Sequence, residues 1–239
     1  MALLEGHGLT KKFGGVQALT DVDFVLNKGE IVGLIGPNGA GKTTLFNLIA
    51  GAFKPTSGRV IFNGIDITSK AANQTCRLGI ARTFQVTRPF PEMTCLENVG
   101  VSINNSARQT ERGNWRESAQ SVLKQMGLHH RHETLAKSLN LIEKKKLEMA
   151  RALATKPDIL LLDEVLGGLN SQEIQESVNL IQGLREDLKL TIFWIEHVMG
   201  AIMKAADRVI VLDQGANLMD GTPEEVVGDD RVIKAYLGE

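Results

Sequence analysis

Short apolar runs separated by polar segments predict most of the strands in this chain. Four runs have continuous apolar centres, which is typical of strands buried on both faces: 31–35 (IVGLI), 158–164 (DILLLDE), 191–196 (TIFWIE) and 208–213 (RVIVLD). Residues 22–27 (VDFVLN) alternate instead and predict a half-buried strand. Two further short strands are predicted in RVIFNG (59–64) and IARTF (80–84).

Helical patterns lie between these strands. A helical stretch follows the first buried strand at 44–51 (TLFNLIAG), residues 92–157 are mostly helical, and another helix runs from about 171 to 187. Strands that alternate with helices predict an α/β fold around a parallel sheet. The early alternating strands add an antiparallel flank, and the middle of the chain adds a helical insertion.

Residues 138–153 (SLNLIEKKKLEMARAL) predict an amphipathic helix. Apolar residues recur there at helical spacing (Leu147, Ala150, Leu153 and Ala154), and the lysines at 144–146 are expected to face water. Asn140 followed by Glu143 resembles a capping box, so the helix is expected to begin there. Whether LNLIE has a second role depends on the rest of the chain.

Composition narrows the possible classes of protein. The chain has 239 residues, 43% hydrophobic and 23% charged, which suits one large domain or two small ones. A net charge of -1 without a basic cluster argues against a nucleic-acid binder. The start MALLEGHG lacks the features of a secretory signal, and no stretch approaches the ~20 apolar residues of a membrane span. Cys76 and Cys95 lack metal-site spacing and are expected to be reduced.

A phosphate-binding loop is the most specific signal. Residues 36–43 (GPNGAGKT) match G-x-x-x-x-G-K-[ST] between a predicted strand and a predicted helix. The glycines let backbone N–H groups turn toward phosphate oxygens, and the helix N-terminus adds partial positive charge. We expect Lys42 to reach the outer phosphates and the Thr43 hydroxyl to hold Mg²⁺.

Polar residues that follow the later strands fit the same site. Asp163 and Glu164 end one strand, Gln85 follows another, and His197 follows a third. A solvated strand end is the alternative for the acidic pair, and a lone Gln or His is more often structural. Their positions just past successive strands favour a shared role, because ligands of α/β sheets bind beyond the strand carboxyl ends. Asp163 would then hold the Mg²⁺ shell, and Glu164 would orient or deprotonate the attacking water.

These pieces, in this order, resemble the ATP-binding subunits of ABC transporters over nearly the whole chain. GPNGAGKT resembles the Walker A motif, Gln85 the Q-loop residue, ILLLDE (159–164) the Walker B motif, and His197 the H-loop switch. The resemblance implies a RecA-like P-loop NTPase core with an antiparallel β flank and an inserted helical subdomain. Residues 1–85 and 158–239 would form the nucleotide-binding core, and residues 86–157 the helical subdomain.

The resemblance also implies a role for each matching residue, with ATP and Mg²⁺ as cofactors. Phe13 would stack on adenine, and Ala18 would line the same face. The phosphates would lie against Gly36, Pro37, Asn38, Gly39, Ala40, Gly41, Lys42, Thr43 and Thr44. The metal would be held by Thr43, Gln85 and Asp163. Hydrolysis would depend on Glu164, His197, Gln85 and Lys42.

The family's LSGGQ signature answers the question about LNLIE. Leu139, Asn140, Leu141, Ile142 and Glu143 occupy its place, and of the five only the leucine is kept. In the family this segment contacts the ATP of a second subunit. The bulk of Leu141 and Ile142 and the charge of Glu143 predict that the site completed by this signature is weak. Residues 168–170 (GLN) also depart from the family, which usually has Asp at the end of this loop.

Finer features resemble one subgroup, the first ATPase subunit of high-affinity branched-chain amino-acid importers. They are RTFQ (82–85), EMTCLENV (92–99), LLLDEVLGGLN (160–170), IEHVM (195–199) and the ending GTPEEVV…VIKAYLGE (221–239). Importers of urea or amides share them. The resemblance implies transmembrane permease subunits and a second ATPase subunit, so that a heterodimer forms, and indirectly a solute-binding protein. It places the chain peripherally on the cytoplasmic face of the inner (plasma) membrane.

Alternatives stay open at this point. A lipid or lipopolysaccharide exporter would use the same type of ATPase, a non-transport ABC protein would act in translation or repair, and a regulatory module would bind nucleotide without hydrolysis. The segment 86–93 (VTRPFPEM) is either a surface loop that docks on a membrane subunit or an ordinary loop with Phe90 buried.

Overall fold

A six-stranded sheet lies at the centre of the computed structural model, which describes residues 1–106, 108 and 114–237. Its order is β10-β9-β3-β8-β7-β6; the pairs from β9 to β6 are parallel, and β10 is antiparallel to β9. The strands are β3 (Ile31–Ile35), β6 (Ile80–Arg82), β7 (Ile159–Asp163), β8 (Thr191–Ile195), β9 (Arg208–Asp213) and β10 (Ala216–Gly221). Every residue of β3, β7 and β8 is buried, so the continuous apolar runs are confirmed as central parallel strands.

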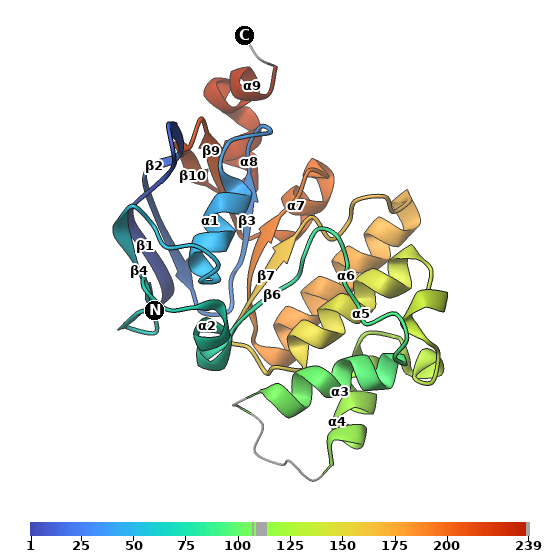
Figure 1. Cartoon of the computed structure of the whole chain (residues 1–239). Helices are drawn as coiled ribbons and strands as arrows, with labels where there is room; N and C mark the ends of the chain where they lie inside the picture. The colour runs from blue at the N-terminus through green and yellow to red at the C-terminus, as the bar shows by residue number, and fades with distance from the viewer. Residues whose placement is uncertain (107, 109–113, 238–239) are drawn as a thin grey trace.

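An antiparallel sheet flanks the core, in the order β2-β1-β4-β5 (Figure 1). Its strands are β1 (Ala2–Phe13), β2 (Val16–Asn27), β4 (Ser57–Phe62) and β5 (Ile65–Asp66). The alternation at 22–27 is confirmed, because Val22, Phe24 and Leu26 are buried while the residues between them are exposed. Strand β1 was not predicted, since irregularities in its pairing with β2 interrupt the period-two pattern.

Some helices pack on the two sheets, and others form a helical group of their own. They are α1 (Lys42–Ile49), α2 (Ala72–Leu78), α3 (Cys95–Asn105), α4 (Trp115–Gln125), α5 (Leu141–Leu153), α6 (Ser171–Leu188), α7 (Met199–Ala205), α8 (Pro223–Gly228) and α9 (Asp230–Leu237), with 3-10 turns at His129–Arg131 and Ala136–Ser138. Helices α3, α4 and α5 lie on the side of the parallel sheet away from β1, β2 and β4 (Figure 1). No helix among the described residues is both long enough and apolar enough to cross a bilayer.

The parallel sheet separates two hydrophobic cores. Leu160, Leu162 and Trp194 face the core built with the helical subdomain. Leu161 and Phe193, one position along the same strands, face the core shared with α1 and the antiparallel sheet. Because side chains alternate across a strand, the central strands join the two halves of the protein.

Helix α5 begins where the sequence predicts, but one of the lysines expected to face water is buried. The Asn140 side chain accepts from the Glu143 N–H at 2.9 Å, and the Glu143 carboxylate accepts from the Asn140 N–H at 3.0 Å, so the capping box is present. Leu147 is fully buried. The expectation that all three lysines face water is wrong, because Lys145 is only 6% exposed. Its Nζ lies 3.3 Å from the backbone carbonyl oxygen of Glu164, where β7 ends.

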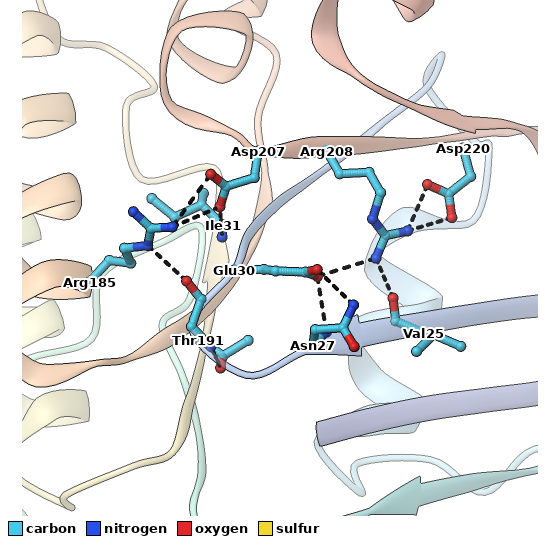
Figure 2. Close-up of polar contacts among 10 residues, drawn as sticks. Val25, Asn27, Glu30, Ile31, Arg185, Thr191, Asp207, Arg208 and Asp220 are labelled. Atoms are coloured by element: carbon cyan, nitrogen blue, oxygen red, sulfur yellow. Dashed lines mark hydrogen bonds and ion pairs between the residues drawn. The ribbon is translucent and has the colours of Figure 1, made fainter. Parts of the chain in front are cut away.

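A cluster of charged residues connects the two sheets at the edge where β3 and β9 begin (Figure 2). Arg208 donates to both carboxylate oxygens of Asp220 at 2.7 and 2.6 Å, and to the backbone carbonyl of Val25 in β2. It also lies 3.4 Å from Glu30. Burial favours a raised pKa for Glu30, but hydrogen bonds from Asn27 and the charge of Arg208 outweigh it and lower that pKa. The charged residues at this edge therefore stabilise the packing of the two sheets. The phosphate loop lies at the opposite edge, where β3 ends.

Candidate nucleotide-binding site

Two glycines of the phosphate loop lie where a Cβ would collide with the backbone. Gly41 has φ +97° and caps the start of α1, and a Cβ there would lie 2.7 Å from the Ala18 carbonyl oxygen. At Gly36 a Cβ would lie 2.1 Å from the Leu212 carbonyl oxygen. Close packing on β2 and β9 therefore fixes the loop. The first N–H groups of any helix lack partners within it, so the start of α1 is suited to bind an anion.

Lys42 is held inside this loop. Its Nζ donates to the carbonyl oxygens of Gly36 at 2.7 Å and Pro37 at 3.0 Å, and the residue is 6% exposed. Burial lowers the pKa of Lys42, although the nearby charges of Glu164 and Asp163 act in the opposite direction. An anion bound in the loop would complete the charge pairing of this ammonium.

An open pocket of about 200 Å³ joins the loop to the strand ends. It is lined by Ala18, Asn38, Gly39, Ala40, Gly41, Lys42, Thr43, Thr44, Glu164 and His197. Most residues expected around the phosphates and the reacting water thus share one cavity. Phe13 lies outside this lining, at the end of β1, where it is 41% exposed and makes an edge contact with Phe53 at 5.4 Å between ring centroids.

Three predicted residues meet at the ends of neighbouring strands β6, β7 and β8. Glu164 follows β7 with a left-handed backbone (φ +50°), and its N–H donates to the Ile195 carbonyl oxygen at 2.9 Å. One oxygen of its carboxylate lies 2.8 Å from His197 Nε2, and the other accepts from the Gln85 amide. The carboxylate is thus oriented beside the pocket, where it could accept a proton from water.

Asp163 has a partner that the sequence did not reveal. Its Oδ2 accepts from Arg82 Nη2 at 2.7 Å, and the side chains of Asp163 and Arg82 are 4% and 10% exposed. Asp163, Thr43 and Gln85 together offer carboxylate, hydroxyl and amide oxygens. Mg²⁺ prefers this oxygen chemistry and needs few protein ligands when phosphates supply others. The donor set therefore fits the expected metal.

Comparisons with known proteins assign this chain to a family. The sequence pattern of the ABC transporter family matches residues 19–167. The chain belongs to this ABC transporter family. A second pattern, described as the branched-chain amino acid ATP-binding cassette transporter, matches residues 217–239.

Related sequences match this ABC ATPase over almost its full length. The high-affinity branched-chain amino acid transport ATP-binding protein LivG of Salmonella typhimurium is 39% identical, over 99% of this chain and 98% of LivG. BraF of Pseudomonas aeruginosa, which bears the same description, is 38% identical over the same shares. The lipopolysaccharide export ATP-binding protein LptB of Haemophilus influenzae is 30% identical, over 100% and 98%.

Solved structures agree with the fold. The ADP conformation of MJ1267, an ATP-binding cassette of an ABC transporter, superposes with a TM-score of 0.89 at 30% identity and covers 100% of both chains. A nucleotide-free ATP-binding cassette gives the same three values. The expected ATPase core with its antiparallel flank and helical subdomain is therefore confirmed.

The signature-like segment of the ABC ATPase lies at the start of α5 and outside the pocket lining. The carboxylate of Glu143 accepts from Arg131 Nε at 2.8 Å, in addition to closing the capping box. Burial favours a raised pKa for Glu143, but these bonds and the Arg131 charge lower it. Arg131 therefore pairs with this carboxylate, and the repulsion of phosphates by Glu143 stays a prediction. The bulk remains, since Leu141 is 46% exposed and its Cδ2 lies 3.0 Å from the position of a Cβ at Gly168.

Two contacts of the ABC ATPase were missed from sequence, namely Arg82 with Asp163 and a second one at the C-terminus. The Gly36 N–H donates to the Tyr236 hydroxyl at 2.7 Å, so α9 touches the beginning of the phosphate loop. No local pattern announces this contact. In the segment 86–93, the alternative with Phe90 buried is wrong, because this side chain is 41% exposed. The Arg151 guanidinium stacks 5.0 Å from the centroid of its ring.

Proposed function

We propose that this ATPase is the motor subunit of a membrane importer for branched-chain amino acids or a related small solute. The observation that carries the proposal is the convergence of Glu164, Gln85 and His197 beside the phosphate loop, which suits hydrolysis. The relatives LivG and BraF, named for branched-chain amino acid transport, support the solute class. A lipopolysaccharide exporter is the second candidate, with a less similar relative.

ATP is held by groups that line the pocket and by Phe13, which lies outside this lining. Backbone N–H groups of the phosphate loop and of the start of α1, together with the Lys42 ammonium, contact the phosphates, and Phe13 and Ala18 contact the adenine. Thr43, Gln85 and Asp163 would hold Mg²⁺, which would neutralise charge on the phosphates. We also propose residues 1–85 and 158–239 as the nucleotide-binding core and 86–157 as the helical subdomain.

Hydrolysis depends on the orientation of Glu164. Its carboxylate accepts a proton from the attacking water, while Gln85 and His197 hold both of its oxygens in place. His197 also lies in the pocket lining, where its ring can donate to the outermost phosphate. Because these three residues follow three adjacent strands, a shift of one strand end changes the geometry of the whole site.

Coupling to the membrane follows from a second surface. A groove of about 290 Å³ runs between the core and the helical subdomain, and its lining includes Arg82, Phe84, Ser102, Glu148 and Arg151. Phe84 is 50% exposed there. We place a permease segment in this groove, which puts the ATPase peripherally on the cytoplasmic face of the membrane. ATP shifts the population of the closed ATPase pair because it binds that state better.

The functional unit is a heterodimer with two unequal sites. The productive site joins Lys42 and Glu164 of this chain to the signature of a second ATPase subunit. The other site is completed by residues 139–143 of this chain, where Leu141 and Ile142 keep the backbone from approaching a phosphate. A solute-binding protein delivers solute to the permeases and contacts this chain only indirectly.

The experiment uses the purified complex with its permeases in liposomes. Lys42→Ala in this chain should nearly abolish ATP hydrolysis, whereas the matching mutation in the partner ATPase should leave much of it. Equal losses would mean equivalent or strictly coupled sites, and reversed losses would mean that residues 139–143 work as a signature. Solute-loaded binding protein should stimulate hydrolysis with leucine, and stimulation by lipopolysaccharide instead would support the exporter.

A further inference from the structure

Arg82 occupies an unusual position between the metal carboxylate and the phosphate-loop helix. It is the last residue of β6, and its Nη2 donates to Asp163 Oδ2 at 2.7 Å. Its Nη1 donates to the side-chain oxygen of Asn47, also at 2.7 Å. Asn47 belongs to α1, the helix that begins with Lys42. One guanidinium therefore connects three elements that converge on the proposed Mg²⁺ site.

The surroundings of Arg82 are not those of a purely stabilising ion pair. Its guanidinium carbon lies 6.0 Å from the Phe46 ring centroid and 5.5 Å from that of Phe84. Its Nε is buried and has no acceptor among the described residues. A buried N–H without a partner costs stability, and a buried ion pair is itself weak evidence for stabilisation. The arrangement is better explained by what the charge does to Asp163.

We propose that Arg82 is a resident counter-ion that shares Asp163 with Mg²⁺ and weakens the binding of the metal. Arg82 keeps the carboxylate paired and oriented through Oδ2 and leaves Oδ1 for the metal or its water shell. Its positive charge would oppose a cation at Asp163 and so favour release of the metal with the products. The inference rests on the proposed metal role of Asp163 and makes Arg82 a positioning residue.

Two effects of Arg82 oppose each other, and their sizes decide the direction of the test. The hydrogen bond fixes one rotamer of Asp163, which favours metal binding modestly. A cation held by Asp163 would lie one carboxylate away from this charge. The Arg82 and Asp163 side chains are only 10% and 4% exposed, so repulsion between the two charges would be several times stronger than in water. We therefore expect the charge to dominate. Removing it should tighten Mg²⁺ about 10-fold or more, which corresponds to at least about 1.4 kcal/mol.

Mn²⁺ is a suitable probe, because free and bound Mn²⁺ are distinguished by electron paramagnetic resonance without any turnover. The affinity of Mn²⁺ for the ADP complex is compared in wild type, Arg82→Gln and Arg82→Lys. Gln removes the charge and retains an N–H donor for Asp163, whereas Lys retains the charge. We expect about 10-fold tighter binding for Gln and a change within about twofold for Lys. Asn47→Ala removes one hydrogen-bond acceptor of Arg82 and keeps the charge, so its Mn²⁺ affinity should also stay within about twofold of the wild-type value.

Controls separate this inference from the proposed site. ADP affinity in EDTA should be unchanged in all variants, and thermal unfolding should show that they are folded. Arg82→Met, which fills the slot between the two phenylalanines, provides a second charge-free variant if Gln does not fold, and it too should bind Mn²⁺ more tightly. Folded charge-free variants with unchanged or weaker Mn²⁺ affinity would refute the role of Arg82. Unchanged Mn²⁺ affinity in Asp163→Ala would instead refute the metal role of Asp163. The counter-ion role of Arg82, which rests on it, would then fail as well.

Discussion

Replacement of Glu164 by Gln tests the chemistry of the site with the least change in shape. The side chain is 17% exposed, and its two carboxylate oxygens face His197 and Gln85. Gln has the same length, so the His197 contact can persist, and the Gln85 amide can rotate to restore its own. The variant therefore loses the ability to accept a proton while the pocket keeps its walls.

The expected loss follows from that single function. A positioned acid–base group contributes ~10²–10⁴-fold to the rate. This corresponds to about 3–5 kcal/mol of transition-state stabilisation. ATP binding should be equal or tighter, because a negative charge beside the phosphates disappears and Lys42 is released from the attraction of Glu164. Slow hydrolysis with retained binding would distinguish catalysis from folding.

The assay is phosphate release at saturating ATP, with nucleotide affinity measured separately by a fluorescent analogue. Glu176→Gln is the matched control, because this exposed carboxylate on α6 accepts only from Gln172, at 3.1 Å, among the described residues. It should hydrolyse ATP at the wild-type rate. Glu164→Asp keeps the charge but withdraws it from the pocket, so it should also be slow. Wild-type turnover in Glu164→Gln would remove this residue from the mechanism, because the site would still hydrolyse ATP without its carboxylate.

Three smaller perturbations test other parts of the site. Phe13→Ala should weaken ATP and GTP binding alike by roughly 1–3 kcal/mol, because stacking on the ring does not depend on the edges of the base; an unchanged affinity would leave Phe13 with only its contacts to Phe53 and Lys11. Tyr236→Phe removes the acceptor of the Gly36 N–H and should weaken ATP binding by about 0.5–1.5 kcal/mol, measured by titration; no change would show that α9 does not position the loop. Burial raises the pKa of Cys95 to about 11, so in a Cys76→Ser variant at pH 8 its thiol should be inert to a disulfide reagent until urea unfolds the protein, and rapid native labelling of that variant would contradict this.

Local patterns in the sequence determined the parts of the protein that depend on neighbours along the chain. The phosphate loop was predictable because its turn needs glycines at fixed positions, and Gly36 and Gly41 meet backbone oxygens where any Cβ would collide. The central strands were predictable because burial on both faces requires continuous apolar runs. The capping box at Asn140 is local for the same reason, since its partners are three residues apart.

Contacts between residues far apart in the sequence were decided by the tertiary structure. Arg82 and Asp163 are 81 positions apart, and Gly36 and Tyr236 are 200 apart, so no periodic pattern links them. Lys145 is one of three consecutive lysines, and it is buried because the end of β7 happens to offer a carbonyl oxygen to that face of α5. A sequence indicates which side chains can pair, but the order and packing of strands determine which of them come within hydrogen-bonding distance.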